Sequence, residues 1–298
     1  MWVSVAEGDK IPTDMKLDGI NAIITGGTGG IGKAIASRFL REGSRVLIVA
    51  RNAAELESTR QEFSIYDTAL GTEVCDVSKS EDVCALAEKV QARFGGNVDV
   101  LINAAGIYGP KGFLEKTDEK AWLETILVNL YGTMLMTRSV LPMMKKQKSG
   151  VVINFSGGGE GAFPRFSAYA ASKGGIVRFT ESIAEEIREF GIRVNAIAPG
   201  AVNSKLLDEA LAAGKEKVGE ALYHKLLKQK EEGGASPDLA AELCVFLSSD
   251  VSRTLTGRVF SAVWDNPTVI EQHSNEIMAT DIYTYRRIRP NDRGCEWK

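Results

Sequence analysis

A glycine-rich turn near the start of the chain constrains the fold more than any other feature. Residues 25–32 read TGGTGGIG and lie between an apolar stretch at 21–24 and a helical pattern at 33–42. Glycine accepts positive φ angles and lets a backbone approach a phosphate closely, and the N-terminus of a helix offers unpaired N–H groups and a positive dipole end. The turn therefore predicts a dinucleotide site. Its candidate contacts are Gly26, Thr28, Gly30, Ile31 and Gly32.

The chain alternates strand and helix patterns from this turn to residue 263. Six apolar runs predict strands, and one more strand ends at Cys75. The six runs are 21–24, 45–50, 98–102, 151–155, 192–197 and 258–263. Such alternation is typical of an α/β fold with right-handed crossovers. We expect a single doubly wound domain, with a mainly parallel seven-stranded sheet and helices on both faces.

The whole chain divides into three segments. Residues 1–16 have no regular period and are interpreted as a leader outside the fold. The domain would span 17–264 and contain a helical, mixed-charge insertion at about 205–233. A C-terminal extension at 265–298 follows the last strand.

Composition places the chain among ordinary globular proteins, with 44% hydrophobic and 25% charged residues in a length of 298. A net charge of −3 argues against nucleic-acid binding, which usually needs a basic surface. The sequence has neither an apolar run of about 18 residues nor a signal-peptide core, so we expect a cytoplasmic protein without membrane contact. Its four cysteines lack metal-ligand spacing, so we expect buried, reduced thiols and no metal site.

The stretch at 151–178 brings a hydroxyl, a phenol and an ammonium together. Its apolar start predicts a buried strand with Ser156 at the carboxyl end, where open α/β sheets bind ligands. The helical periodicity that follows places Tyr169 and Lys173 one turn apart on one face. Because an ammonium favours a neighbouring phenolate, we expect Lys173 to lower the pKa of Tyr169 toward the range of a general acid or base.

Ser156, Tyr169 and Lys173, with a glycine-rich turn of the form T-G-x-x-x-G-x-G, resemble the short-chain dehydrogenase/reductase family. The resemblance runs from about residue 17 to 263. It implies a Rossmann-type oxidoreductase that moves a hydride between a nicotinamide cofactor and a carbonyl or secondary alcohol. Ser156 would hold the carbonyl oxygen and Tyr169 would exchange the proton. Tyr169 and Lys173 would also contact the cofactor, Lys173 through the nicotinamide ribose.

Asn129, in the run VNLYGT, is the fourth catalytic residue that the resemblance implies. Asparagine is mildly unfavourable inside a helix because its amide competes for backbone hydrogen bonds, so a buried one needs a partner. In the family this residue bends a long helix, expected here at 120–148, and holds a water bonded to the active-site lysine. Asn129 would therefore serve Lys173.

The resemblance places further cofactor contacts after three other strands. Asp76 and Val77 would flank the adenine, and Ala104 would let the cofactor lie close to the sheet. The neighbouring Asn103 is as well suited to tying strands together as to touching the cofactor. A third set follows the strand at 192–197: in the loop that begins at Pro199, the backbone of Val202 and the hydroxyl of Ser204 would bond the nicotinamide carboxamide.

The end of the second strand bears on the choice between NADP and NAD. An acidic residue there would bond the ribose 2′-hydroxyl of NAD and repel a 2′-phosphate, but the chain has Ala50 followed by Arg51. The guanidinium of Arg51 could pair with the phosphate of NADP, with the Thr28 hydroxyl as a second contact. The sequence favours NADP. An NAD-dependent dehydrogenase of the same family and a non-catalytic NADP-sensing regulator remain as alternatives.

The expected partners are a small carbonyl or alcohol substrate and other copies of the chain. Aromatic and apolar residues at 108–113 and 162–166 suit a partly apolar substrate. By resemblance, a homodimer or homotetramer would pair through the helices at 120–148 and 167–190. The extension is rich in arginine and aromatic residues, unlike most disordered tails, so we expect a docked arm over a substrate opening of its own or a neighbouring subunit.

Overall fold

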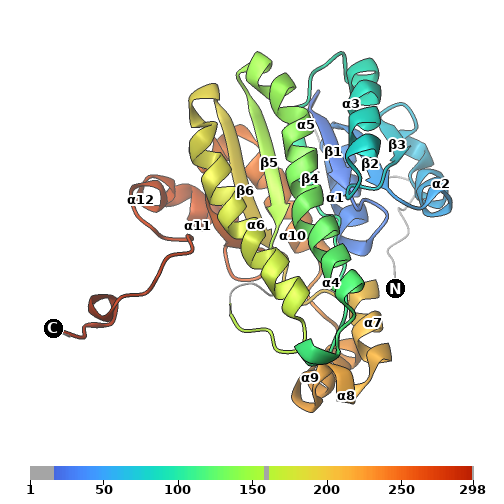
Figure 1. The fold of residues 1–298 in the computed structure, drawn as a ribbon. Helices are drawn as coiled ribbons and strands as arrows, with labels where there is room; N and C mark the ends of the chain where they lie inside the picture. Colours follow the sequence, from blue (N-terminus) through green and yellow to red (C-terminus); the bar gives the residue numbers. More distant parts are fainter. Residues whose placement is uncertain (1–16, 158–160, 297–298) are drawn as a thin grey trace.

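The computed structural model describes residues 17–157 and 161–296. The leader predicted at 1–16 lies outside the described residues, as does Trp297 near the end of the extension. Within these ranges a central sheet carries helices on both faces, and a small group of helices lies at one end of it (Figure 1).

The described residues contain one sheet of seven parallel strands in the order β3-β2-β1-β4-β5-β6-β7. The strands are β1 (Asn21–Thr25), β2 (Arg45–Ala50), β3 (Leu70–Val74), β4 (Val100–Asn103), β5 (Gly150–Phe155), β6 (Ile192–Ala198) and β7 (Val259–Ser261). The doubly wound fold predicted from the sequence is confirmed. The strand order reverses between β1 and β4, so their carboxyl ends meet at the crevice where such sheets bind ligands.

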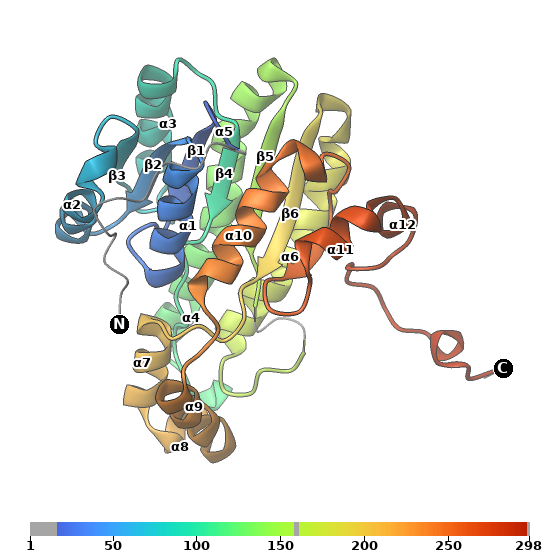
Figure 2. The same cartoon turned by 180° about the vertical axis from the view of Figure 1, so that it is seen from behind.

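Helices cover both faces of this sheet (Figures 1 and 2). On one face, α1 (Gly30–Arg41) and α10 (Pro237–Ser248) pack against each other. The opposite face carries α3 (Ser80–Phe94), α5 (Gly132–Gln147) and α6 (Ser167–Glu186), while α2 (Ala53–Glu62) lies beside β3. Both faces of the strands are thus removed from water, which explains their nearly continuous apolar sequences.

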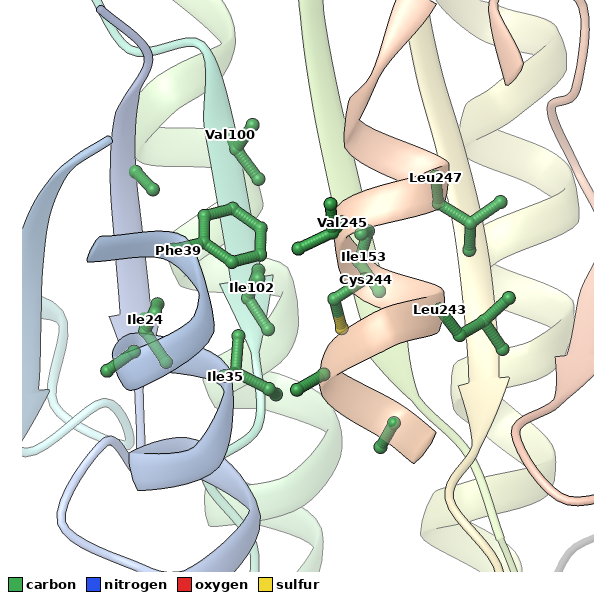
Figure 3. Close-up of a cluster of buried hydrophobic side chains, with 14 of the residues drawn as sticks. Ile24, Ile35, Phe39, Val100, Ile102, Ile153, Leu243, Cys244, Val245 and Leu247 are labelled. Atoms are coloured by element: carbon green, nitrogen blue, oxygen red, sulfur yellow. The ribbon is translucent and has the colours of Figure 1, made fainter. Parts of the chain in front are cut away.

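The core beneath α1 and α10 is formed mainly by closely packed aliphatic side chains, which surround the Phe39 ring in Figure 3. Phe39 of α1 and Cys244 of α10 are fully buried there. The strands contribute Ile24, Val100, Ile102 and Ile153 from below. Because burying one large aliphatic or aromatic side chain stabilises a fold by about 1.5–3 kcal/mol, this cluster holds the two helices in register over the sheet.

The long helix expected at 120–148 is divided into three parts. It begins as α4 (Glu119–Ile126), continues through a π-helical turn (Leu127–Tyr131) and ends as α5, which includes Pro142. The π-helical turn contains Asn129. Such turns often occur at functional sites, because they displace a side chain from the regular helical face.

The insertion forms three helices at the carboxyl end of the sheet. They are α7 (Lys205–Ala213), α8 (Lys215–Val218) and α9 (Glu220–Glu232), as the sequence predicted in outline. Val218 and Ala210 pack with Phe166 in a small apolar cluster of their own. Short 3₁₀ turns lie at Ser64–Tyr66, Leu114–Lys116, Arg188–Phe190, Asp250–Ser252 and Pro290–Arg293.

The C-terminal extension docks along β7, the edge strand. Its helices α11 (Pro267–Gln272) and α12 (Ser274–Ala279) bury Ile270 and Ile277 in the main core. The Val259 N–H donates a hydrogen bond to the Tyr283 carbonyl oxygen at 2.9 Å, which covers backbone groups that an edge strand would otherwise expose.

The extension is therefore docked, as its composition predicted, but not over the chain's own substrate opening. Tyr285 packs against Val177 of α6 and Val259 of β7, whereas α7 to α9 lie at the carboxyl end of the sheet (Figures 1 and 2). The expectation that the extension covers its own chain's substrate opening was wrong. Its apolar residues pack instead against the apolar surface at the edge of the sheet. A contact with a neighbouring subunit stays a prediction.

The described helices include none that is long and apolar enough to cross a membrane. All four cysteines are unpaired. Cys75 and Cys244 are buried as predicted, whereas Cys84 is exposed and Cys295 is partly exposed, so burial was wrongly predicted for these two.

Candidate active site

The glycine-rich turn lies against the residues that follow β4. Gly26 has a φ of +65°, and a Cβ atom there would lie 2.8 Å from the Ala105 Cα atom. Gly32 is helical, and a Cβ atom on it would lie 2.3 Å from the Gly26 carbonyl oxygen. Gly26 therefore needs both its positive φ and its small size, whereas Gly32 needs only the small size.

Gly30 has neither constraint. It begins α1, and no heavy atom lies within 4 Å of a Cβ atom built on it. The residue before it, Gly29, caps the helix without a side-chain hydrogen bond, and the first turn has no acidic residue. The uncapped N–H groups and the open approach at Gly30 fit the phosphates of a dinucleotide. Thr28 and Ile31 flank this approach in the same turn.

Asn103, at the end of β4, ties neighbouring elements together. Its Nδ2 atom donates to Asn154 Oδ1 on β5 at 2.9 Å and to Thr137 Oγ1 on α5 at 3.2 Å. Of the two roles left open by the sequence, the structure shows the structural one. The following Ala104 and Ala105 lie against Gly26, so larger side chains on the turn would collide with them.

Asp76 and Val77 follow β3 and are held by local contacts. Asp76 Oδ1 accepts hydrogen bonds from the Ser78 hydroxyl at 2.7 Å and the Ser78 N–H at 3.0 Å. Burial raises the pKa of Asp76, but the two Ser78 hydrogen bonds and the charge of Arg51 outweigh it and leave the pKa below its ordinary value. Val77 is buried against Gly132 of α5.

Ser156 follows the last residue of β5 and is buried. Its N–H donates to the Ile197 carbonyl oxygen at 2.8 Å, which fixes the backbone. Its Oγ atom makes no hydrogen bond to any residue that the structure describes. A buried hydroxyl without a partner is costly and uncommon in native proteins, so this atom is suited to binding an oxygen of a bound molecule.

Tyr169 and Lys173 lie one turn apart on α6, as predicted, and face the end of β5. The Lys173 Nζ atom donates a hydrogen bond to the Phe155 carbonyl oxygen at 2.6 Å and lies 5.6 Å from the centre of the Tyr169 ring. A Cβ atom built on Gly157 would lie 4.0 Å from the Tyr169 hydroxyl oxygen. The hydroxyl, phenol and ammonium groups are therefore gathered around one strand end.

Burial controls the protonation of both α6 groups. It lowers the pKa of Lys173 to about 8. It also raises the pKa of Tyr169, with a smaller contribution from Tyr108. The expected lowering of the tyrosine pKa is thus contradicted, because the ammonium is directed at the Phe155 carbonyl oxygen and desolvation of the phenolate dominates. In this arrangement the Tyr169 phenol stays protonated at neutral pH.

Asn129 is fully buried, and its side chain makes three hydrogen bonds to residues beside Lys173. Its Oδ1 atom accepts from the Ile107 N–H at 2.8 Å, and its Nδ2 atom donates to the Ile107 carbonyl oxygen at 2.9 Å and to Ser172 Oγ at 2.9 Å. A Cβ atom on Gly106 would lie 3.3 Å from Asn129 Oδ1 and 3.8 Å from Lys173 Nζ. Asn129 therefore positions the backbone next to Lys173.

The loop after β6 leads from Pro199 to α7. A Cβ atom built on Gly157 would lie 3.6 Å from Pro199 Cδ, so the loop passes the Tyr169 side of the site. The Val202 N–H donates to the Gly200 carbonyl oxygen at 3.1 Å. Ser204 caps α7, and its side chain makes no capping hydrogen bond. The Ser204 hydroxyl is thus available to a ligand, whereas the Val202 N–H is engaged within the loop.

Glu55 is a neighbour of the turn that sequence reasoning missed. Thr28 Oγ1 donates to Glu55 Oε2 at 3.1 Å, and Lys205 Nζ lies 3.9 Å from Glu55 Oε1. The nearby Arg51 lies 3.9 Å from Glu124 and is half-exposed. The position of Glu55 in the first turn of the helix after the second strand was the signal that could have identified it, since such turns adjoin the glycine-rich turn of the same sheet.

The two loops expected at the substrate opening meet in an aromatic cluster. The Tyr108 ring lies edge-on to Phe166, with centroids 5.3 Å apart, and to Tyr169, with centroids 4.7 Å apart. Phe163 stacks on Phe166 at 4.5 Å. The insertion adds Tyr223 and aliphatic side chains to this cluster. An apolar wall thus stands beside the phenol of Tyr169, as predicted from the loop sequences.

These features define a class of protein, a dinucleotide-dependent oxidoreductase of Rossmann type. The pattern of the short chain dehydrogenase family matches residues 21–214. An uncharacterised oxidoreductase of Mycobacterium bovis is 36% identical over 82% of this chain and 95% of the relative. The chain belongs to the short-chain dehydrogenase/reductase family. It is an NAD(P)-dependent enzyme that interconverts alcohol and carbonyl groups.

Two solved structures show the same fold with different cofactors. A xylitol dehydrogenase with bound NAD⁺ superposes with a TM-score of 0.75 at 25% identity, covering 83% of this chain and 98% of that one. An actinorhodin polyketide ketoreductase with NADPH gives a TM-score of 0.73 at 29% identity, covering 82% and 95%. Fold alone therefore leaves the choice of cofactor to individual residues.

Proposed function

We propose that this protein is a carbonyl reductase or alcohol dehydrogenase that prefers NADP(H), with Asn129, Ser156, Tyr169 and Lys173 as its catalytic set. The observation that carries the proposal is the buried Ser156 hydroxyl, which has no partner among the described residues and lies at the strand end beside Tyr169 and Lys173. A substrate oxygen would supply the missing partner.

The four side chains divide the work of binding and proton transfer. The bound nicotinamide would supply or accept the hydride. Ser156 would donate its hydroxyl hydrogen bond to the substrate oxygen, and Tyr169, protonated because it is buried, would donate the proton in reduction. Lys173 would hold the cofactor ribose, and Asn129 keeps the backbone at 106–107 in place beside it.

The cofactor would lie across the carboxyl ends of β1 and β4. Gly26, Thr28, Gly30, Ile31 and Gly32 would hold its phosphates, which is supported by the uncapped start of α1. The remaining contacts would come from Arg51, Asp76, Val77, Asn103, Ala104, Pro199, Val202 and Ser204. For Asn103 the strand-tying hydrogen bonds support an indirect contribution.

The preference for NADP(H) is supported by the end of β2. Ala50 has no carboxylate that would repel a 2′-phosphate, and Arg51 follows it with half of its side chain exposed. Its ion pair with Glu124 is long and exposed, and such pairs stabilise little. A doubly charged phosphate would therefore compete well for the guanidinium.

A preference for NAD is favoured by one contact. Glu55 places a carboxylate 3.1 Å from the Thr28 hydroxyl, next to the turn. A carboxylate in that position could accept a hydrogen bond from a ribose hydroxyl and would repel a phosphate. We therefore keep NAD as the second candidate cofactor.

Assembly into a homodimer or homotetramer is part of the proposal. Leu123 of α4 is 52% exposed and Tyr131 of the π-helical turn is 37% exposed. These side chains lie on the helices that would pair. Burial of such apolar surface between copies would be favourable.

The test is a turnover screen of ketones and secondary alcohols with NADPH and NADH, with Tyr169→Phe as the decisive variant. We expect reduction with NADPH in the wild type and a loss of nearly all turnover in the variant, because the proton donor is removed. NADPH binding, measured by fluorescence titration, should stay nearly unchanged because the glycine-rich turn is intact. A variant that keeps more than a few per cent of wild-type kcat would contradict the role of Tyr169.

A further inference from the structure

Lys111 is a nearly buried cation at the substrate opening that the proposed reaction does not use. Only 13% of its side chain is exposed. Its closest charged neighbour is Glu209 of α7, with Nζ and Oε2 3.8 Å apart. That distance is too long for a hydrogen bond, and the ammonium makes none to any residue within 17–157 and 161–296.

The Tyr108 ring contacts both the Lys111 ammonium and Tyr169. Its Nζ atom is 5.8 Å from the centre of the Tyr108 ring. The Tyr108 ring in turn touches Tyr169 edge-on, with centroids 4.7 Å apart. A molecule whose carbonyl oxygen reaches Tyr169 would therefore pass along Tyr108 and bring its other end toward Lys111.

The loop that carries Lys111 is fixed in place. The Gly112 N–H donates a hydrogen bond to the Arg165 carbonyl oxygen at 2.9 Å. The Arg165 guanidinium lies 3.9 Å from the centre of the Phe113 ring and donates to the Glu216 carbonyl oxygen of α8 at 2.7 Å. These contacts hold the loop beside α8, so little further ordering of Lys111 is needed when a ligand binds.

Charge balance at the opening is incomplete. Burial lowers the pKa of Lys111, while the Glu209 charge acts in the opposite direction. Glu209 is 42% exposed and belongs to the insertion, so it can turn into water at little cost. Lys111 is less free to turn into water, because only 13% of its side chain is exposed. A nearly buried ammonium without a hydrogen bond is unfavourable, and an anionic group of a ligand would satisfy it.

We propose that Lys111 binds a carboxylate on the substrate, so that the preferred substrates are oxo acids and the matching hydroxy acids. When no acid is bound, Glu209 is the ion-pair partner of Lys111. This inference rests on the proposed function, because it assumes that the carbonyl end of the substrate reaches Ser156 and Tyr169. The aromatic wall between the two ends would hold the carbon chain of the acid.

The experiment compares acids with their neutral esters in the full-length enzyme with NADPH. The probes are acetoacetate and levulinate, each beside its methyl ester. Wild-type kcat/KM should be higher for the acids. Lys111→Met should lower kcat/KM for the acids by roughly 10- to 100-fold, the loss expected for one charged hydrogen bond, and change the esters less than about twofold.

Glu209→Gln should act in the opposite direction, because it removes the competing carboxylate. We expect it to lower KM for the acids and leave the esters unchanged. Lys215→Met removes an exposed lysine of α8 and is the matched control, with no effect on either probe. Equal losses for acid and ester in Lys111→Met would overturn the proposal, since they would show a structural role only.

A binding measurement separates this proposal from the proposed function. If the wild type reduced none of the probes, the assigned reaction would be in doubt, but levulinate binding to the NADPH complex could still be measured by calorimetry. Tighter binding to the wild type than to Lys111→Met would support the carboxylate site. Equal affinity, or no binding to either protein, would reject it.

Discussion

The Lys173 Nζ atom donates a 2.6 Å hydrogen bond to the carbonyl oxygen of Phe155, the last residue of β5. The bond joins the middle of α6 to the strand end that carries Ser156. It also explains how a buried ammonium is tolerated, because a carbonyl oxygen partly replaces its lost water. The position of Lys173, and through α6 that of Tyr169, thus depends on the end of the neighbouring strand.

Replacing Lys173 should change the pH dependence of stability. Burial lowers the pKa of Lys173 to about 8 in the folded protein, compared with about 10.4 in an unfolded chain. Between these values the unfolded chain binds more protons, so folding becomes more favourable as pH rises through this window. The Tm of the wild type, relative to Lys173→Met, should therefore increase from pH 8 to 10. Differential scanning calorimetry of both proteins across this pH range measures the difference in Tm.

The control for that experiment is Lys146→Met, which removes an exposed lysine of α5. Its Tm relative to the wild type should not vary across the same pH range. A Lys173→Met difference that is equally flat would show that burial does not lower the pKa of Lys173. Lys173→Met should also lose turnover and bind NADPH more weakly, because one ammonium would serve both.

Ser156→Ala should separate stability from activity. Removing a buried hydroxyl that has no partner among the described residues should leave Tm unchanged or raise it. Loss of the donor to the substrate oxygen should lower kcat by roughly 10²–10³-fold. Ser248→Ala is a matched control, since its Oγ atom is also buried without a described partner but belongs to α10. It should affect Tm similarly and leave kcat at the wild-type level.

Cofactor preference should respond in opposite directions to Arg51 and Glu55. Arg51→Ala combined with Ala50→Asp should switch preference from NADPH to NADH, because loss of a charged hydrogen bond costs about 1.5–3 kcal/mol, or roughly one to two decades of affinity. Glu55→Gln should strengthen NADPH binding by removing the carboxylate beside Thr28. The measurement is KM for NADPH and for NADH in the wild type and in each variant.

Glu57→Gln provides the comparison for Glu55, because Glu57 is exposed on the same helix and contacts Gln61 rather than the turn. It should leave both KM values unchanged. A wild type that already prefers NADH would refute the NADP proposal and support the role of Glu55 as a ribose acceptor.

Two truncations should distinguish the docked part of the extension from its end. Stopping after Trp264 removes Ile270 and Ile277 from the core and the carbonyl acceptors of the buried Arg258, so Tm should fall by roughly 10 °C or more. Stopping after Arg286 keeps these contacts and should change Tm little. Neither the Tm nor the substrate KM of the shorter truncation should differ from the wild type by more than experimental error.

Size-exclusion chromatography of both truncations completes that test. Exposure of the β7 edge in the longer truncation should promote self-association. A change in substrate KM when only residues 287–298 are missing would instead support an arm that reaches the opening of a neighbouring subunit.

The order of strands and helices was predictable because it depends on local patterns. The run Arg45–Ala50 was predicted to its exact residues, and the other strands differ from their predicted bounds only at the ends. Apolar runs in a parallel sheet are buried on both faces, so they stand out in the sequence. The candidate groups Ser156, Tyr169 and Lys173 were likewise found by position, because a strand end and one helical turn were enough to bring them together.

Features that depend on contacts between distant segments were not predictable. The sequence indicated only that glycines in the turn could adopt a positive φ, and the structure gives one to Gly26, whereas Gly30 and Gly32 are helical. The predicted direction of the Tyr169 pKa shift was wrong, because desolvation depends on all the groups that pack around the phenol. The contact between Glu55 and Thr28 joins residues 27 positions apart, and only the position of Glu55 in the first turn of its helix pointed to it.

The sequence by itself therefore determined the alternation of strands and helices, the position of the glycine-rich turn and the candidate catalytic side chains, because each depends on residues close together in the chain. Only the tertiary structure decided that Lys173 donates to Phe155, that Ser156 lacks a described partner, and that the extension covers the β7 edge. Burial, charge balance and edge pairing are properties of residues far apart in sequence, and they exist only once the chain is folded.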